Sequence, residues 1–479
     1  MYGKRGGMMP FSGGMYGKRS AYDDKRAVMP FSGGMYGKRS GVRSVRSPMP
    51  FSGGFYGKYA ASAVDSLSPQ RFLEMIWLFV IGYLLYLFVN WVARSDPPKL
   101  LDIYSQPGKW YLFKFHLMKW VIGRRQKKSR ESAQKDNMMD TQFGGSGKRD
   151  PKDMDRKTEL PKHKKMPVEA VFFDASNKDG WYFTLGTAQR KNNIINLFFI
   201  VRIPGKGTFI CPEMLTDTNV PSVPGEAWET ESGFKLVCEE PMVRWRLSYN
   251  GPLVKSRGER IHTKVGPDEM PDGEEFIPAS FDLVWTNFGE AFDFDIDVSP
   301  TSIAHSLAIE PWSKALFKTL QESHQMHYEQ FGFLQGDLKI GSETYTPSMT
   351  SMRDHTKASH RNWADLRRYI MMIYHLDDGT CIHTSVISMP ETVFTQLEFG
   401  YVITPDKKKI AVDRVYFQLP HHGEDKHFPK EFAYSFDAGE LHYDVEVKVI
   451  EVNEQMCQYV ANGVKGQGFA EVEYRISPY

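Results

Sequence analysis

One uncharged apolar stretch divides this 479-residue chain and constrains what can fold on either side of it. Residues 75–93 read MIWLFVIGYLLYLFVNWVA, 19 residues without Asp, Glu, Lys or Arg. A helix of about 20 apolar residues spans the roughly 30 Å hydrocarbon core of a bilayer. A buried core helix or a cleaved signal sequence is the alternative, but the stretch is apolar on all sides and no small-residue cleavage pair follows it. We therefore predict a transmembrane helix at 75–93.

The chain before this helix repeats one short phrase. Residues 9–17, 29–37 and 49–57 read MPFSGGMYG, MPFSGGMYG and MPFSGGFYG, and the first two continue directly into Lys-Arg. Paired basic residues suit the acidic clefts of prohormone-processing proteases, and an exposed C-terminal glycine is the donor of a C-terminal amide. A flexible Gly- and Ser-rich linker is the alternative, but a linker requires no identical text with a dibasic pair at a fixed offset.

The repeats resemble the amidated neuropeptide-like precursors of nematodes over residues 1–60. The resemblance implies a disordered region from which processing proteases release peptides ending in Gly-Gly-Met-Tyr-amide or Gly-Gly-Phe-Tyr-amide, which act on a receptor. We expect the start of this chain to be truncated, with a signal peptide and further repeats upstream of Met1 in the full precursor, because residues 1–5 are the tail of another copy. The amide-donor glycines are Gly17, Gly37 and Gly57, and the processing positions are Lys4, Arg5, Lys18, Arg19, Lys25, Arg26, Lys38 and Arg39.

Basic residues follow the apolar helix. The cluster 124–130 reads RRQKKSR, and a polybasic run beside a membrane span is attracted to the anionic cytoplasmic leaflet. We therefore expect a single-pass protein with its C-terminal domain in the cytosol. Residues 94–123 form the juxtamembrane segment, and within it residues 110–122 are apolar with basic breaks, which predicts a helix lying in the membrane interface. Residues 124–167 contain almost no large aliphatic residues and are predicted to be a disordered basic linker.

The two ends of the chain place opposite demands on its topology. Released peptides must be lumenal, whereas the basic flank favours a cytosolic C-terminal domain. Four cysteines and the absence of any Asn-X-Ser/Thr acceptor agree with the cytosol for the larger part. We hold two interpretations open: a true composite protein, or a gene-model fusion in which Met75 is close to the start of the second protein.

From Val168 onward the sequence predicts a mainly β architecture. Aromatic and β-branched runs alternate with turn signals at 180–185, 196–202, 243–249 and 441–450. Asn250-Gly251 predicts a hairpin turn after the third run. One helix, kinked at Pro311, is expected between 302 and 321, where it would separate two β halves.

The second half carries a motif of its own, with the residues Tyr328, Glu329, Arg353, Asp354, His355, Arg361 and Trp363. In this motif the sequence resembles the calycin-like family of tandem lipocalin-type barrels, which includes AttH-like proteins, hydroxyneurosporene-synthase-like hydratases and invertebrate proteins called phosphoenolpyruvate synthase-like. The resemblance implies two tandem barrels, at 168–325 and 326–479. Lys357 and Ala358 stand where the family has an aromatic residue and a glycine.

The Arg353-Asp354-His355 sequence has two interpretations. A carboxylate beside an imidazole is suited to proton transfer at a barrel mouth. Alternatively, Arg353, Asp354 and the Trp363 indole form a structural ion-pair network that closes the end of the barrel. Neighbouring residues on a strand point to opposite faces, so Asp354 and His355 cannot line one pocket without a turn between them. We favour the structural interpretation.

No cofactor is predicted. Asp293, Asp295 and Asp297 alternate as they would on one strand face, and a calcium loop requires a sharp turn and a glycine. The cluster 421–427, HHGEDKH, has no familiar metal-ligand spacing. A net charge of +2 does not indicate nucleic-acid binding. We expect a membrane-anchored barrel protein that holds a lipid-like molecule, because closed barrels of this size hold one small ligand. A hydratase or isomerase acting on that ligand is the alternative.

Overall fold

The computed structural model describes residues 69–131, 151–215, 217–256, 275–361, 365–390, 392–424, 429–451 and 456–474. All the repeat, processing and amide-donor positions lie outside these residues, as does Trp363. The described chain belongs to two separate units, of which one holds the first helix and the other holds residues 96 onward.

The first unit contributes a single described element, helix α1 (Pro69–Ala93). Gln70–Ala93 is the one described helix that is long and apolar enough, by length and composition, to cross a membrane. The predicted span at 75–93 therefore lies within a helix that begins six residues earlier.

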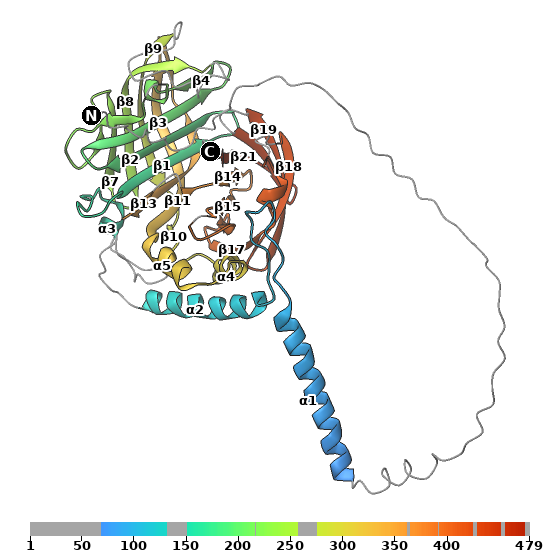
Figure 1. Cartoon of the computed structure of the whole chain (residues 1–479). Helices are drawn as coiled ribbons and strands as arrows, with labels where there is room; N and C mark the ends of the chain where they lie inside the picture. Colours follow the sequence, from blue (N-terminus) through green and yellow to red (C-terminus); the bar gives the residue numbers. More distant parts are fainter. Residues whose placement is uncertain are drawn as a thin grey trace, which may run out of the picture. The chain divides into compact units, whose positions relative to one another are not determined.

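The second unit is built on two closed barrels of eight antiparallel strands each (Figure 1). In the first barrel β1, β2, β3, β4, β8, β9, β11 and β13 pair in that order, and the pairing of β13 with β1 closes the ring. Short strands extend its edges. Their bounds are β1 Val168–Ser176, β2 Tyr182–Arg190, β3 Ile194–Ile203, β4 Gly207–Ile210, β5 Asn219–Pro221, β6 Trp228–Glu229, β7 Phe234–Glu240, β8 Arg244–Lys255, β9 Phe276–Asn287, β10 Phe292–Asp293, β11 Gln325–Ile340, β12 Glu343–Tyr345 and β13 Ser348–Ala358.

The second barrel is an up-and-down meander in which each strand pairs with the next and β21 pairs back with β14. Parallel crossovers are absent from it, so its register is set by hairpins alone. Its strands are β14 Arg368–Leu376, β15 Cys381–Ser388, β16 Leu397–Ile403, β17 Lys409–Val415, β18 Glu431–Ala438, β19 Leu441–Glu451, β20 Met456–Ala461 and β21 Val464–Tyr474.

Side chains fill the interior of the first barrel. Trp228, Trp245 and Trp285 have 0% exposed surface and pack with about thirty other buried residues in one core. Strand alternation explains the pattern, because every second residue of β8 and β9 is buried. Burying a large apolar side chain contributes roughly 1.5–3 kcal/mol, so this core is the main source of the barrel's stability.

Three helices of the second unit lie together against one side of the barrels (Figure 1). Helix α2 (Tyr111–Glu131) packs on α4 (Pro300–Ile309), which is followed by α5 (Lys314–Glu322). Ser299 and Ser313 cap α4 and α5 by accepting hydrogen bonds from Thr301 N and Leu316 N. The expected kinked helix is therefore two helices, separated where Pro311 cannot continue the first.

Three sequence expectations differ from the structure. The boundary expected between residues 325 and 326 is displaced, because β11 and β13 both belong to the first barrel and the chain passes to the second only after Ala358. The α4–α5 pair accordingly lies within the first barrel's strands and does not separate the two halves. The residues of the predicted linker also take part in folding, since α3 (Pro151–Asp155) ends in a fully buried aspartate.

The hairpin predicted at Asn250-Gly251 was wrong. Strand β8 runs straight through both residues, which pair with Ser280 and Ala279 of β9. Gly251 is required for a close approach: a Cβ there would lie 2.6 Å from the hydroxyl oxygen of Tyr249, which folds back to donate to the Pro252 carbonyl at 2.7 Å. Glycine in a strand marks such an approach as well as a turn.

Candidate functional site

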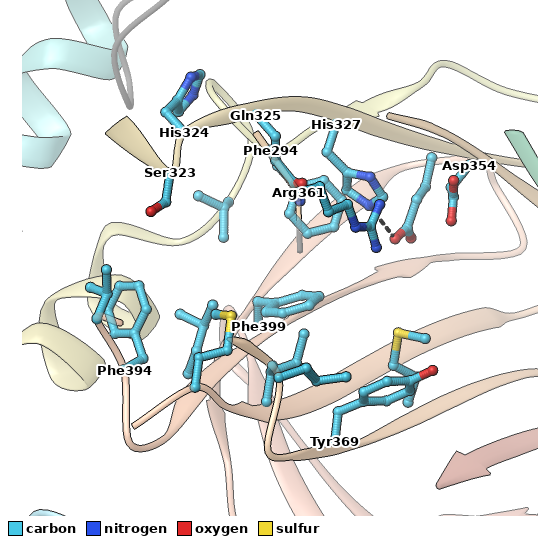
Figure 2. Close-up of a pocket in the computed structure, with 18 of the residues that line it drawn as sticks. Phe294, Ser323, His324, Gln325, His327, Asp354, Arg361, Tyr369, Phe394 and Phe399 are labelled. Atoms are coloured by element: carbon cyan, nitrogen blue, oxygen red, sulfur yellow. Dashed lines mark hydrogen bonds and ion pairs between the residues drawn. The ribbon is translucent and has the colours of Figure 1, made fainter. Parts of the chain in front are cut away.

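A cavity of about 310 Å³ lies between the outer faces of the two barrels, under α4 and α5 (Figure 2). It is not inside either barrel, where the sequence interpretation placed the ligand. Most of its wall is apolar. The apolar lining includes Phe172, Phe294, Val298, Ile303, Leu320, Met352, Met371, Ile373, Ile387, Met389, Val393, Phe394, Leu397 and Phe399.

Strand register determines which motif residues reach the cavity. Phe172 of β1, Asp354 of β13 and Glu329 of β11 form one cross-strand row, and all three line the cavity. The neighbouring row, which includes Tyr328 and His355, points into the first barrel. Asp354 and His355 therefore point to opposite faces of β13, as strand alternation predicts.

The polar end of the cavity is organised around one buried carboxylate. Glu329 accepts at its two oxygens from His327 Nε2 at 3.0 Å and from His383 Nδ1 at 2.6 Å. His327 Nδ1 in turn lies 2.7 Å from the Thr356 hydroxyl. A carboxylate between two imidazoles fixes the orientation of both rings.

Burial and charge act in opposite directions on these groups. Burial would raise the pKa of Glu329, but His383 and His327 outweigh it and hold the pKa at about 2. Burial lowers the pKa of His327, and Glu329 together with Asp354 raises it above its ordinary value. Burial also raises the pKa of Asp354, and the charge of His327 opposes that effect without cancelling it.

His383 is the functional candidate that the sequence did not reveal. It is 1% exposed and lines the cavity, and its Nε2 atom has no hydrogen-bond partner. Because Nδ1 is bound to Glu329, a neutral ring places its proton there and leaves the Nε2 lone pair available. One polar residue in a buried strand was the only sequence signal, and that signal is common to many structural histidines.

Arg361 supplies a positive charge at the same end of the cavity. Figure 2 shows it beside His327, on the side where Asp354 also lies. Burial lowers the pKa of Arg361, and the charge of Asp354 opposes that effect. Of the seven motif residues, Glu329, Asp354 and Arg361 therefore line the cavity.

Tyr328, Arg353 and His355 belong to a second polar cluster, sealed inside the first barrel. Its centre is Asp155 of α3, which is 0% exposed and pairs with Arg353 through two contacts of 2.9 and 3.1 Å. Tyr328 donates to the same carboxylate, and the Trp245 indole donates to it at 3.0 Å. Burial would raise the pKa of Asp155, but Arg353 and His355 hold it far below the ordinary range.

The second carboxylate of this cluster is Glu169. His355 Nε2 lies 3.0 Å from it, and the Lys357 amine lies 3.4 Å from it. Thr158 donates to its other oxygen from both the amide and the hydroxyl, at 2.8 Å each. Lys357, the departure from the family motif, thus has a structural partner in this chain.

The expected pairing of Arg353 with Asp354 is corrected accordingly, whereas the expected part of Trp363 in that network concerns a residue outside the described segments. The partner of Arg353 is Asp155, whereas Asp354 faces the cavity on the opposite side of β13. A pairing of Asp354 with His355 is excluded by the same geometry. Sequence could not supply Asp155 because it lies 198 residues before Arg353.

The acidic residues at 293–297 have structural partners, and the cysteines are free thiols. Only Phe292 and Asp293 form a strand, so the single strand face expected for Asp293, Asp295 and Asp297 was wrong. Asp295 contacts His324 at 2.7 Å, and Asp297 contacts Lys409 at 2.9 Å. Within the described segments, no group of three or more His, Cys, Asp or Glu side chains could hold a metal ion. All four cysteines lie in those segments as free thiols.

Comparison with solved structures returns distant likenesses. An AttH protein from Nitrosomonas europaea is 11% identical with a TM-score of 0.41, covering 68% of this chain and 97% of that one. Kievitone hydratase from Nectria haematococca is 9% identical with a TM-score of 0.36, covering 70% and 98%. CghA is 8% identical with a TM-score of 0.39, covering 66% and 90%. The fold assignment rests on the strand pairing of this chain itself.

No curated protein matches the sequence. A family model does, and its match runs from within α1 to just after β20, so that the matched region includes most of the apolar helix, the first barrel and every strand of the second barrel except β21. The match covers residues 78–462 and leaves the repeats outside it. The chain belongs to this family, DUF8627, a family of unknown function.

Proposed function

We propose that this protein is a membrane-anchored binding protein for an apolar, lipid-like small molecule, which occupies the cavity between the two barrels. The observation that carries the proposal is the cavity itself. At about 310 Å³ it has the size of a small-molecule site, and its wall is mostly apolar with a few convergent polar groups at one end. Apolar contacts would supply most of the affinity.

The polar end defines the ligand further. Arg361 and the unpaired His383 Nε2 atom suit a ligand that carries one hydrogen-bonding or anionic group on an otherwise apolar body. A ligand group that meets His383 removes the cost of leaving a buried polar atom unsatisfied. Fatty acids and hydroxylated isoprenoids have this shape.

Ligand titration of the full chain in phospholipid nanodiscs tests the proposal. A fluorescent fatty-acid analogue is the probe. Met371→Trp fills the cavity from β14 and is expected to weaken binding about tenfold or more. Ile450→Trp, at a side chain that is 45% exposed on β19, is the matched control and should leave affinity unchanged. Equal affinities for the two variants would contradict binding in this cavity.

A specific observation favours catalysis as a second candidate. Glu329 orients His383 so that its free nitrogen lines the cavity, which is the arrangement of a general acid or base. Burial raises the pKa of Asp354, which lines the same space. Hydration or isomerisation of an unsaturated ligand requires a proton donor and acceptor of this kind.

Deuterium transfer distinguishes binding from catalysis. The chain is incubated with mixed unsaturated lipids in heavy water, and mass spectrometry records deuterium incorporated at carbon. Catalysis predicts incorporation that His383→Gln and Asp354→Asn abolish while the fluorescent analogue still binds. His355→Ala is the contrasting variant, expected to lower stability because His355 belongs to the sealed cluster. If the wild-type chain incorporates no deuterium, catalysis is contradicted and only the binding function remains.

The repeats and the topology complete the proposal. We propose that residues 1–60 are a precursor of amidated peptides that act on a receptor, and that the barrels lie in the cytosol behind a single membrane span. The identical phrases with dibasic pairs support the first part, and the basic cluster at 124–130 supports the second. Because the family match leaves the repeats outside it, a fusion of two genes is the alternative to a composite protein.

Two measurements test these parts. Mass spectrometry of tissue extracts should detect the amidated peptides, and a long-read transcript across codons 50–100 should join the repeats to the apolar helix. Peptides found without such a transcript would establish the fusion. Protease protection of the barrels in sealed microsomes tests the orientation, since a cytosolic domain is digested from outside.

A further inference from the structure

Helix α2 has an apolar face that no described part of the chain covers. Leu112, Phe113 and Trp120 are 67%, 60% and 58% exposed, and Leu117 is 37% exposed. With His116 they line one shallow surface. Large apolar side chains gathered on one exposed face mark an interaction site.

Contacts made by the opposite face of α2 hold the helix in this orientation. Ile122 is buried in a core shared with α4, and Gln126 donates to the Val298 carbonyl at 2.8 Å. The Tyr111 hydroxyl lies 2.6 Å from His305 Nδ1. Since α2 is held along its length by these contacts, it cannot rotate to hide its apolar side chains without leaving α4.

The second half of α2 is strongly basic. Arg124, Arg125, Lys127 and Lys128 are exposed, and no acidic residue lies in the first turn. The exposed surface therefore passes from apolar to cationic along one helix. An amphipathic helix with aromatic and leucine side chains beside lysine and arginine binds the headgroup region of an anionic bilayer.

We propose that the outer face of α2 docks on an anionic phospholipid bilayer, with Leu112, Phe113, Leu117 and Trp120 inserted among the headgroups and the basic half lying on the surface. Charge complementarity favours lipid over a second copy of the chain, whose own α2 carries the same positive charge. The chain also permits it, because the unit that holds α2 begins at Asp96 and α1 ends at Ala93, so that only two residues join this unit to the proposed membrane span.

Docking in this position has a consequence for the cavity. Helix α4 contacts α2, and Ile303 of α4 lines the cavity. The helices that cover the cavity would then be next to the bilayer, from which an apolar ligand can partition. This consequence rests on the proposed function, but the docking itself does not.

The full chain in nanodiscs tests the docking through a probe on α2. Leu117→Cys carries an environment-sensitive fluorophore, and Glu440→Cys, in the exposed turn between β18 and β19, is the control. Native thiols should react little, because three are buried and burial raises the pKa of the fourth, Cys238, to about 12. Lipid-borne quencher should act on position 117 and not on position 440, and more strongly in anionic than in neutral discs.

Charge variants give the second readout. Neutralising Arg124, Arg125, Lys127 and Lys128 to Gln should remove the dependence on anionic lipid, since each basic side chain near such a surface changes binding about fivefold. Lys206, Lys235, Lys408 and Lys448 to Gln is the control of equal charge change on the barrels. Three results would overturn the proposal: aqueous quencher reaching position 117 in every lipid, shielding that is equal in detergent, or shielding that requires two copies per disc.

Discussion

The two faces of strands β11 and β13 contribute to two similar polar clusters, of which one is sealed inside the first barrel and the other lies at the wall of the cavity. On the inner face, Arg353 and His355 meet Asp155 inside the first barrel, and every one of these side chains is 0% exposed. On the outer face, His383 and His327 meet Glu329 at the wall of the cavity. Both clusters combine a buried carboxylate with imidazoles.

The difference lies in what surrounds the unsatisfied atom of each cluster. The Asp155 carboxylate accepts from Arg353, Tyr328 and Trp245, which uses its hydrogen-bonding capacity, and the unpaired Arg353 Nε is sealed inside the barrel. In the Glu329 cluster the unpaired atom, His383 Nε2, belongs to a side chain that lines the cavity. Buried polar groups are normally satisfied, and an unpaired atom at a cavity wall is one that a bound molecule can reach. Charge and burial alone therefore do not separate a structural cluster from a candidate site.

The largest effect is expected for Asp155→Asn. It removes the counter-charge of a fully buried arginine, and breaking a buried pair in this way costs about 3–5 kcal/mol of unfolding free energy. Chemical denaturation of the full chain in nanodiscs measures it. Asp282→Asn breaks an exposed pair with Arg246 and should cost at most about 1 kcal/mol. Similar costs for both variants would mean that the sealed cluster does not stabilise the barrel.

The second-largest effect is expected from acid, which should remove the stabilising contribution of the cavity cluster. The pKa of Glu329 is depressed to about 2 in the fold, so its stabilising contribution is present above its ordinary pKa near 4.3 and is lost as the pH falls toward 2. The loss is on the order of 3 kcal/mol. Denaturation at a series of pH values measures it, and Glu329→Gln should flatten the profile over this range. An unchanged slope in that variant would assign the acid sensitivity to other carboxylates.

Two tyrosine substitutions compare the sealed cluster with the cavity wall directly. Tyr328→Phe removes a buried hydroxyl that donates to Asp155 and should cost about 1–2 kcal/mol. Tyr369→Phe removes a hydroxyl that donates to Glu471 at 2.6 Å beside the cavity, and should cost less than about 1 kcal/mol. Thermal unfolding of the two variants in parallel gives the order. The reverse order would place the more important network at the cavity.

The smallest effect is expected for Asp354→Asn, and its sign is opposite to that of Asp155→Asn. Because burial raises the pKa of Asp354, its ionised form opposes folding at neutral pH, and the amide removes that cost. The variant should be up to about 1 kcal/mol more stable at pH 7 and equal to the wild type at a pH where Asp354 is protonated. A clear loss of stability at pH 7 would show that the carboxylate has a structural partner.

Local patterns predicted the elements and the facing of their side chains. The runs at 196–202 and 441–450 are strands β3 and β19, and Asp354 and His355 lie on opposite faces as period-two alternation requires. These predictions depend only on neighbouring residues. The Asn250-Gly251 hairpin failed because the glycine is there to admit the Tyr249 side chain, a contact that sequence does not show.

Long-range pairings could not be predicted. Asp155 reaches Arg353 across 198 residues, and His383 reaches Glu329 across 54. The position of β11 and β13 in the first barrel depends on their pairing with β9 and β1, which no single strand's sequence specifies. The cavity arises between two outer faces, so each barrel considered alone gives no sign of it.

The residues before the first strand are part of the protein's interior. Tyr104 is 1% exposed within the core of the second barrel and donates to Glu424, while Asp155 is inside the first. A fragment that starts at residue 168 would lack both, and would leave Arg353 charged and unpaired. The chain between the apolar helix and the barrels therefore cannot be exchanged for a neutral spacer, and the smallest independently folding piece begins ahead of Tyr104.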